Sequence, residues 1–193
     1  MNLALFDFDG TLTTKDSLDE FLKYSVGKKE YFIKMFKFLP YLVLWQTKIM
    51  SNSAAKEHLF RIFFKGVSEE LFKKRARDFS HEKLDLIINQ ERLNILREHQ
   101  SNGDRVVIVS ASMQCWLQPW CDKNNIELLS TRLEFKEGEF TGRFLTKNCH
   151  GKEKESRIKE FLKVEDYKVV YAYGDSSGDK EMLELAHKSI LYK

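Results

Sequence analysis

The clearest pattern in the chain is a set of short apolar runs that end in polar residues. Residues 2–9 contain the first run, and residues 105–109 and 168–173 contain two more. Continuous apolar runs of this length, rich in β-branched residues, are typical of strands that are buried on both faces of a parallel sheet. We therefore predict three buried strands at these positions and a last short strand over residues 189–192.

Residues 16–100 follow a different period, in which apolar residues recur every three or four positions. Leu18, Phe21 and Leu22 are one example. This spacing places apolar side chains on one face of a helix, so the segment is predicted to be mostly helical. A hairpin is also expected, with its turn near Glu137-Gly138. The hairpin covers residues 132–145, and the remaining helices are predicted over residues 113–124, 153–163 and 179–187.

Strands that alternate with helices predict an α/β fold, with a Rossmann-like parallel sheet core flanked by helices. The helical segment between the first two strands is too long for a simple crossover, and an inserted α-helical cap explains it best. The expected division assigns residues 1–13 and 83–193 to the α/β core and residues 14–82 to the cap.

One part of the expected cap, residues 31–50, is very apolar but contains Lys34, Lys37 and Pro40. Its longest unbroken apolar run is too short to span a bilayer. The segment could form the core of the cap, line an apolar substrate pocket, or make a peripheral contact with a membrane through its lysines.

The composition narrows the class of protein. The chain has 193 residues and a formal net charge of +3, and 32% of its residues are charged. This near balance argues against a nucleic-acid binder, whose basic residues would outnumber the acidic ones on one face. Three cysteines in no Cys-x-x-Cys pair, and a first strand that leaves no room for a signal peptide, favour a cytoplasmic protein. No obligate protein partner is evident.

Asp7 and Asp9 follow the first apolar run, two positions apart, and Gly10 comes next, where the chain can turn sharply. In a strand, residues two apart point to the same face, so both carboxylates face the same way. Placing two carboxylates together at the end of a buried strand is costly unless a cation or a reaction uses them. The pair suits a carboxylate nucleophile, a neighbouring acid/base and a divalent metal.

Two other predicted strands also end in polar residues, at Ser110 and at Asp175. Parallel sheets bind their ligands beyond the carboxyl ends of the strands. These residues should therefore meet Asp7 and Asp9 in space.

Together these segments resemble the four signature motifs of the haloacid dehalogenase-like (HAD) phosphohydrolases. The motifs are Asp7-Phe8-Asp9-Gly10-Thr11, Ser110, a downstream lysine, and Gly174 to Asp179 (Gly-Asp-Ser-Ser-Gly-Asp). The position of the cap resembles subfamily IB, which includes the phosphoserine phosphatases. The last motif departs from theirs at Ser176 and Gly178, and looks more like that of phosphatidylglycerophosphate phosphatases.

The resemblance implies a mechanism. Asp7 would be the nucleophile that forms an aspartyl-phosphate, and Asp9 would be the general acid and then the general base. Magnesium (Mg²⁺) would be held by the side chains of Asp7 and Asp175 and by the backbone carbonyl of Asp9. An aspartate at position 9 also favours phosphate ester hydrolysis, because dehalogenases and ion-pumping ATPases lack one there.

The resemblance also implies supporting roles. Ser110 would donate a hydrogen bond to a phosphate oxygen, and Gly10, Thr11 and Asp179 would support the site. We assign the catalytic lysine to Lys154, which lies four residues before Ile158 and seven before Phe161, on the face of a helix that should pack inward. Lys152 remains the alternative.

The substrate is expected to be a small phosphate monoester, such as a phosphoserine-like ester. A lipid-linked monoester, or transfer of the phosphoryl group to an alcohol, are the alternatives. Asp16, at the entrance to the cap, could bind a substrate amine or simply cap a helix. Arg61 could bind a second anionic group or lie in solvent.

Overall fold

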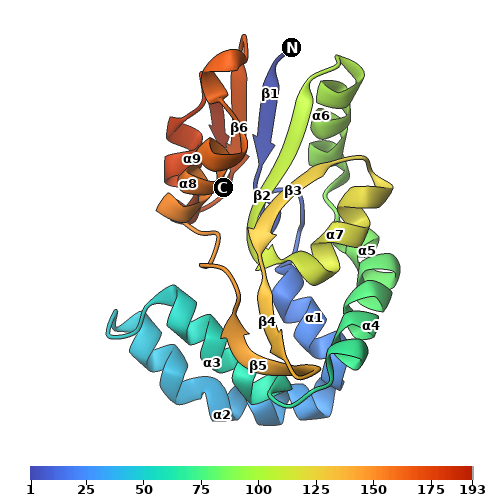
Figure 1. Cartoon of the computed structure of the whole chain (residues 1–193), viewed down its shortest axis with the longest axis vertical. Coiled ribbons are helices and arrows are strands. Elements are labelled where there is room, and N and C mark those ends of the chain that lie inside the picture. Colours follow the sequence, from blue (N-terminus) through green and yellow to red (C-terminus); the bar gives the residue numbers. More distant parts are fainter. Residues whose placement is uncertain (193) are drawn as a thin grey trace.

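The computed structural model describes residues 1–192 and contains a five-stranded, fully parallel sheet with the strand order β3-β2-β1-β6-β7 (Figure 1). The order confirms the predicted α/β fold with a Rossmann-like core. The strands are β1 (Leu3–Phe6), β2 (Arg105–Met113), β3 (Glu127–Thr131), β6 (Val170–Gly174) and β7 (Lys188–Leu191).

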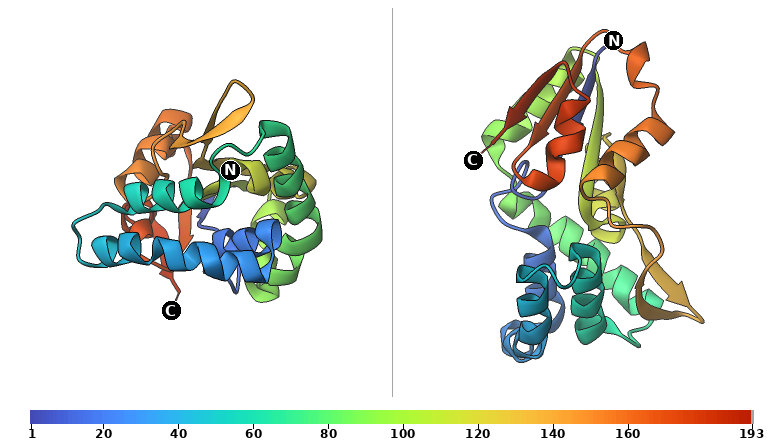
Figure 2. Two further views of the ribbon diagram at one scale, coloured as in Figure 1. Left: turned by 90° about the horizontal axis from the view of Figure 1, so that it is seen from below. Right: turned by 90° about the vertical axis from the view of Figure 1, so that its left-hand side faces the viewer.

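Helices cover both faces of the sheet, and further helices form the end of the molecule that lies farthest from the N-terminus (Figures 1 and 2). They are α1 (Ser17–Val26), α2 (Lys28–Gln46), α3 (Asn52–Phe64), α4 (Glu69–Phe79), α5 (Asp85–Ile87), α6 (Gln90–Ser101), α7 (Gln114–Lys123), α8 (Lys152–Phe161) and α9 (Lys180–Glu184). A π-helical turn over Ser80–Leu84 joins α4 to α5. Among the described residues, no helix has both the length and the apolar character that crossing a membrane requires.

The central strand β1 is buried on both faces, as its apolar sequence predicts. Leu3 and Leu5 pack in one buried cluster with Ile158 of α8, whereas Ala4 and Phe6 belong to the larger cluster on the other face. This alternation is the period-two pattern of a strand. Because β1 is fully buried between β2 and β6, the residues that follow it are held in the middle of the molecule.

The hairpin of β4 (Leu133–Lys136) and β5 (Glu139–Phe144) lies away from the main sheet, against α3 and α4 (Figures 1 and 2). Phe72 of α4 contacts both Phe135 and Phe140, with ring centroids 5.6 and 5.8 Å apart. Leaving the hairpin, the chain runs to α8. Because it packs against α3 and α4, the hairpin extends the helical layer formed by residues 17–79.

Three features of the sheet differ from the sequence-based prediction. β1 ends at Phe6, so Asp7 and Asp9 follow the strand and do not lie within the predicted strand over residues 2–9. β3 was not predicted, because Glu127 and Ser130 interrupt its apolar residues and only one of its edges is paired. β2 is longer than the predicted strand over residues 105–109, so Ser110 lies within it and not after it.

The division into a core and a cap remains a prediction. A bridge between Thr13 and Ile88 brings the two ends of the intervening segment together. The larger buried cluster, however, is continuous from the sheet to helices α1, α3 and α4. The last residue of the predicted core, Lys193, lies outside the described residues.

Phe21 of α1 is fully buried at the centre of this continuous cluster. Its ring stacks on Trp116 of α7 at 4.5 Å and contacts Phe64, Phe72 and Phe79. We expect Phe21→Ala to lower the free energy of unfolding by about 3–5 kcal/mol, because the buried ring is lost and a cavity remains.

Denaturant unfolding would measure this change. Leu86→Ala is the matched control, since Leu86 is 73% exposed and its loss should change stability by about 0.5 kcal/mol or less. Equal effects of the two substitutions would contradict the assignment of Phe21 to the core.

Candidate active site

The ends of three neighbouring strands meet at one cavity. Asp7 and Asp9 follow β1, Ser110 lies within β2 and Asp175 follows β6. The cavity has a volume of about 210 Å³. Its lining residues are Asp7, Asp9, Asp16, Lys56, Ser110, Ala111, His150, Lys154, Asp175, Ser176 and Asp179. The predicted catalytic and metal-binding residues therefore lie together, although they come from distant parts of the sequence.

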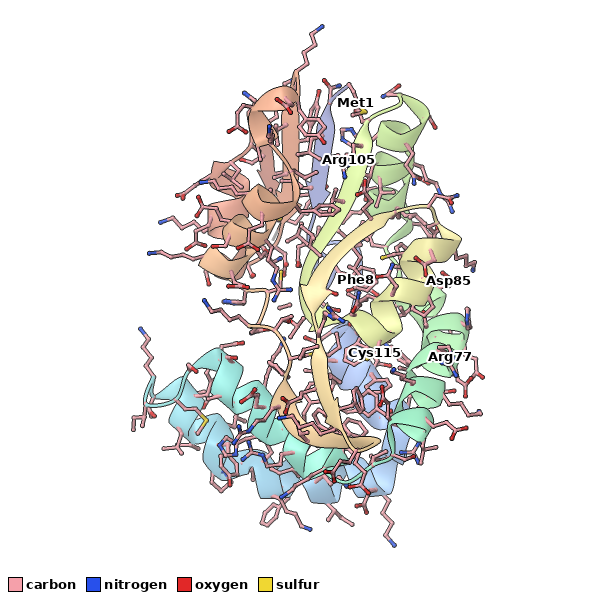
Figure 3. The ribbon with its side chains drawn as sticks, viewed as in Figure 1. Met1, Phe8, Arg77, Asp85, Arg105 and Cys115 are labelled. Atoms are coloured by element: carbon pink, nitrogen blue, oxygen red, sulfur yellow. The ribbon has the colours of Figure 1, made fainter. Side chains whose placement is uncertain are left out.

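The strand-like alternation of β1 continues into this loop. Asp7 and Asp9 line the cavity, whereas Phe8 between them is fully buried in the larger apolar cluster, edge-to-face with Trp120 of α7 at 5.4 Å (Figure 3). Burial of Phe8 fixes the direction of both neighbouring side chains. The two carboxylates thus share a face, as the sequence predicts.

Gly10 allows the next segment to turn beside the cavity. It has a φ of 78°, and a Cβ at this position would lie 2.3 Å from Oδ2 of Asp175. Thr11 then donates a hydrogen bond from Oγ1 to Oδ1 of Asp175 at 3.2 Å. Gly10 and Thr11 therefore bring the first and last motifs into contact. Only glycine fits at position 10 without displacing Asp175.

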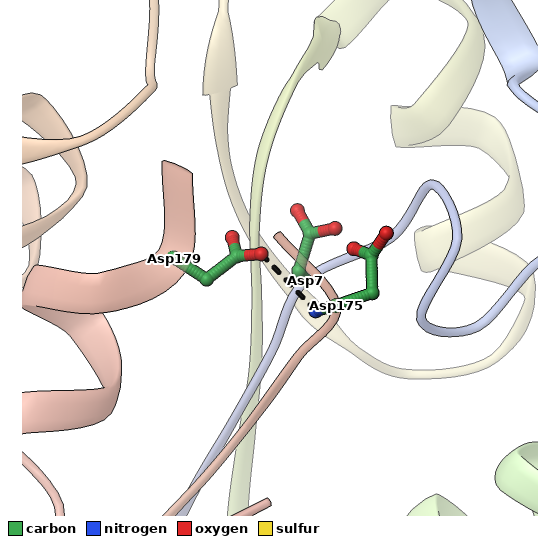
Figure 4. A group of neighbouring side chains, drawn as sticks. All are labelled: Asp7, Asp175 and Asp179. Atoms are coloured by element: carbon green, nitrogen blue, oxygen red, sulfur yellow. Dashed lines mark hydrogen bonds between the residues drawn. The ribbon is translucent and has the colours of Figure 1, made fainter. Parts of the chain in front are cut away.

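Asp7, Asp175 and Asp179 form a cluster in which one carboxylate oxygen from each residue lies within 4.8 Å of the others (Figure 4). Asp179 is already engaged. Its Oδ1 accepts from Lys154 at 2.6 Å, and its Oδ2 accepts from the backbone N–H groups of Asp175 and Ser176 and from the Ser176 hydroxyl. Asp7 and Asp175 are less fully engaged, and an all-oxygen donor set of this kind suits Mg²⁺.

Lys154 of α8 lies between two of these carboxylates. Its Nζ is 2.5 Å from Oδ1 of Asp7 and 2.6 Å from Oδ1 of Asp179, and the side chain is almost fully buried. Burial alone would lower the pKa of this amine, but the two aspartates outweigh burial and raise the pKa above its usual value. Lys154 is therefore a fixed positive charge, whereas Lys152 is exposed at the start of the same helix.

The cavity has more negative than positive charge. Burial, together with Asp179 and Asp9 and against the opposing effect of Lys154, raises the pKa of Asp7 to about 7. Five carboxylates line the cavity with only two lysines. A divalent cation at Asp7 and Asp175 would offset this excess and keep Asp7 ionised.

Hydrogen bonds hold both carboxylate oxygens of Asp9. Its Oδ1 accepts from the backbone N–H of Ser17 at 2.6 Å, and its Oδ2 accepts from the hydroxyl of Ser112. Burial and the nearby Asp16 raise its pKa to about 6, against the effect of these hydrogen bonds. A carboxyl group with a pKa near neutrality can both donate and accept a proton at physiological pH.

Of the other predicted site residues, Ser110 and Asp16 line the cavity and Arg61 does not. Ser110 lines the cavity, and its hydroxyl accepts a hydrogen bond from the backbone N–H of Ser112 at 3.0 Å. Asp16 lines the cavity and also caps α1, where it accepts from the N–H of Asp19 at 2.9 Å. Arg61 does not line the cavity: it lies against Gly142 of β5.

Two cavity residues were missed by the sequence analysis. Lys56 of α3 reaches the site and donates to the carbonyl of Ala111 at 3.3 Å; burial lowers its pKa, although Asp16 and Asp9 oppose this. His150 lies against Gly178, and its pKa is lowered by burial and by nearby lysines. Lys56 lies three and four residues before the buried Leu59 and Phe60, but helical spacing of this kind does not by itself distinguish a cavity lysine from a surface one.

Comparison with known proteins extends these observations. The sequence model of one family, haloacid dehalogenase-like hydrolase, matches residues 4–184. Protein CicA of Caulobacter vibrioides is 33% identical over 186 residues, covering 95% of this chain and 82% of CicA. A histidinol-phosphatase of Neisseria meningitidis is 25% identical over 201 residues, covering 98% of this chain and 89% of the relative.

The fold also matches that of solved structures. A phosphoserine phosphatase described as a phospho-aspartyl intermediate analogue superposes with a TM-score of 0.67 and 18% identity, covering 98% of this chain and 85% of that chain. At this identity the likeness concerns the fold. Since the family match spans nearly the whole chain, including all four motifs, this protein is an enzyme that belongs to the haloacid dehalogenase-like hydrolases.

Proposed function

We propose that the protein is a Mg²⁺-dependent phosphatase that hydrolyses a phosphate monoester through an aspartyl-phosphate on Asp7. The observation that carries the proposal is the position of the Asp7 carboxylate, in a small polar cavity, 2.5 Å from the Lys154 amine and on the same face as Asp9. The histidinol-phosphatase among its relatives supports the proposal, as does the phospho-aspartyl analogue described for a phosphoserine phosphatase of the same fold.

In the first half-reaction a carboxylate oxygen of Asp7 attacks phosphorus. The bond from phosphorus to the ester oxygen breaks, and Asp9 gives its proton to the leaving oxygen. Lys154 and Ser110 bind the phosphoryl oxygens and stabilise their charge. Bound Mg²⁺, held by Asp7, Asp175 and the backbone carbonyl of Asp9, would reduce the repulsion between Asp7 and the phosphate.

In the second half-reaction Asp9, now ionised, takes a proton from a water molecule. The resulting oxygen forms a bond to phosphorus, the bond to Asp7 breaks, and free phosphate leaves. Asp179 positions Lys154 throughout, because it contacts both that amine and the loop of Asp175. The hydrogen bonds from Ser17 and Ser112 keep Asp9 facing the cavity in both steps.

For the substrate, we propose a small polar ester, such as a phosphoserine-like compound, as the first choice. Beyond the motif residues the cavity presents Lys56 and Asp16, one charge of each sign, which suits a leaving group that carries an amine or a carboxylate. A lipid-linked monoester and phosphoryl transfer to an alcohol remain the alternatives. The cytoplasmic location also stays a prediction.

The first test is phosphate release from a panel of monoesters, with Mg²⁺ and with a chelator. The panel spans p-nitrophenyl phosphate, phosphoserine, histidinol phosphate, sugar phosphates and phosphatidylglycerophosphate. We expect release that requires Mg²⁺ and favours a small ester with a charged leaving group. Adding glycerol distinguishes transfer from hydrolysis, since glycerol phosphate forms only by transfer. Release that is unchanged by the chelator would contradict the metal-dependent mechanism.

Asp7→Asn should lower kcat by about 10⁴-fold or more, because the nucleophile is lost. The fold should survive. Burial raises the pKa of Asp7 from 3.8 to about 7, so the folded state is destabilised as pH rises through that range and the group ionises. Above pH 7, without divalent cation, the melting temperature of the variant should equal or exceed that of the parent.

Asp166→Asn is the matched control for this variant, since Asp166 is an exposed carboxylate that does not line the cavity. It should leave kcat unchanged. Substantial turnover by Asp7→Asn, measured on protein shown by mass spectrometry to be free of deamidation, would exclude Asp7 as the nucleophile.

Asp9→Asn should slow hydrolysis of an alkyl phosphate by about 10²–10⁴-fold, since the leaving alkoxide then lacks a proton donor. The first step with p-nitrophenyl phosphate should be much less affected, because p-nitrophenolate leaves without a proton. Rapid-mixing kinetics should therefore show a burst of p-nitrophenolate, while phosphorylated Asp7 accumulates and is detected by mass spectrometry. Equal slowing of the first step for both esters would argue against a role as general acid.

A further inference from the structure

Helix α2 carries an apolar stripe that the rest of the molecule does not cover. Phe32, Phe36, Leu39 and Val43 are 68, 74, 46 and 55% exposed. Their spacing of four, three and four residues aligns them along one line of the helix, which we call the outer stripe. Ile33 of the same helix is also exposed, as is Ile49 three residues after the helix ends. An exposed set of this size on one helix is unusual for a surface that contacts only water.

A second apolar stripe on the same helix already holds α2 in place. Phe38 is buried there, and Tyr31, Met35 and Leu42 pack against the main buried cluster. Polar contacts reinforce this side: Lys34 donates to the carbonyls of Ile62 and Phe63 at 3.3 and 3.0 Å. The outer stripe is therefore not needed to attach α2 to the protein.

The charged residues of α2 and of the residues that flank it in the chain are almost all positive. Lys28, Lys29, Lys37 and Lys48 are exposed in or next to α2, and no acidic residue occurs between positions 31 and 50. The one acidic residue of the helix, Glu30, lies 3.8 Å from Lys34. Figures 1 and 2 place α2 at the end of the molecule opposite the N-terminus, where a flat partner could approach it.

We propose that the outer stripe and its lysines form a docking surface for an anionic lipid bilayer, on which α2 lies parallel to the membrane plane. Apolar side chains along one line of a helix, flanked by lysines, suit the boundary between acyl chains and anionic headgroups. A second copy of this chain fits less well. Whether two α2 helices paired parallel or antiparallel, lysines at their ends would meet lysines, and each helix has one acidic residue, Glu30, against four exposed lysines in or next to it.

The test is co-sedimentation of the full chain with vesicles of phosphatidylcholine alone and with vesicles of equal parts phosphatidylcholine and phosphatidylglycerol. We expect binding to the mixed vesicles that weakens as salt rises. The emission of Trp45 should shift to the blue on binding, because Trp45 is 40% exposed whereas Trp116 and Trp120 are buried.

Phe32→Ser with Phe36→Ser should weaken partitioning by about tenfold or more, since two apolar side chains no longer enter the bilayer. Lys28→Glu with Lys29→Glu should weaken binding of the protein to the mixed vesicles by a similar factor. Glutamates in a first helical turn favour the helix dipole, so α2 should still form. Leu86→Ser with Leu145→Ser is the matched control, because both leucines are exposed and lie outside α2.

Three outcomes would overturn the proposal. The first is failure of the parent protein to bind mixed vesicles, and the second is an equal loss of binding in the leucine control. The third is a stable dimer, seen by analytical ultracentrifugation, that the Phe32 and Phe36 substitutions dissociate. This proposal does not depend on the proposed phosphatase activity: Asp7→Asn should bind vesicles as the parent does, and the Phe32 and Phe36 substitutions should leave hydrolysis of a soluble ester unchanged.

Discussion

The buried amine of Lys154 is the contact on which the rest of the site depends. It joins Asp7, 147 residues earlier in the chain, to Asp179, 25 residues later. Three carboxylates crowded at the end of a parallel sheet would repel one another in a medium of low dielectric, and the amine offsets part of that repulsion. Burial is the main reason that the pKa of Asp7 is raised, and the neighbouring Asp179 and Asp9 add to it. The remaining negative charge is what a divalent cation and the reaction would use.

The same crowding explains where the motifs require small residues. A Cβ at Gly10 would lie 2.3 Å from Asp175, and one at Gly174 would lie 2.6 Å from the Cβ of Asp179. These distances are far below van der Waals contact. The glycines of the first and last motifs are thus a consequence of bringing the carboxylates within 4.8 Å of one another, and a larger side chain at either position would open the cluster.

The features that could be predicted from the sequence are those that depend on the local pattern of apolar and polar residues. β1, β2 and β6 follow from apolar runs, and the meeting of Asp7, Asp9 and Asp175 follows from parallel strands. The features that could not be predicted depend on packing between segments that are distant in the sequence. β3 is a half-buried edge strand with a weak pattern. Lys154 was chosen partly because Phe161 was expected to face inward, yet Phe161 is 47% exposed and only Ile158 supports the argument. Arg61 was separated from the cavity, and Lys56 brought into it, by how α3 packs, which no local spacing records.

The candidate active-site cavity and the outer stripe of α2 have opposite chemistry, so one ligand does not suit both. The candidate active-site cavity is lined almost entirely by charged and polar groups, with Ala111 as its one apolar residue. The outer stripe of α2 is apolar and lies on a helix that is separated from the sheet by α1 and α3 (Figure 1). A bilayer contact through α2 would therefore fix the location and orientation of the protein without placing acyl chains in the cavity. Docking to lipid is thus compatible with a small, polar substrate, and the two proposals do not require a lipid ester.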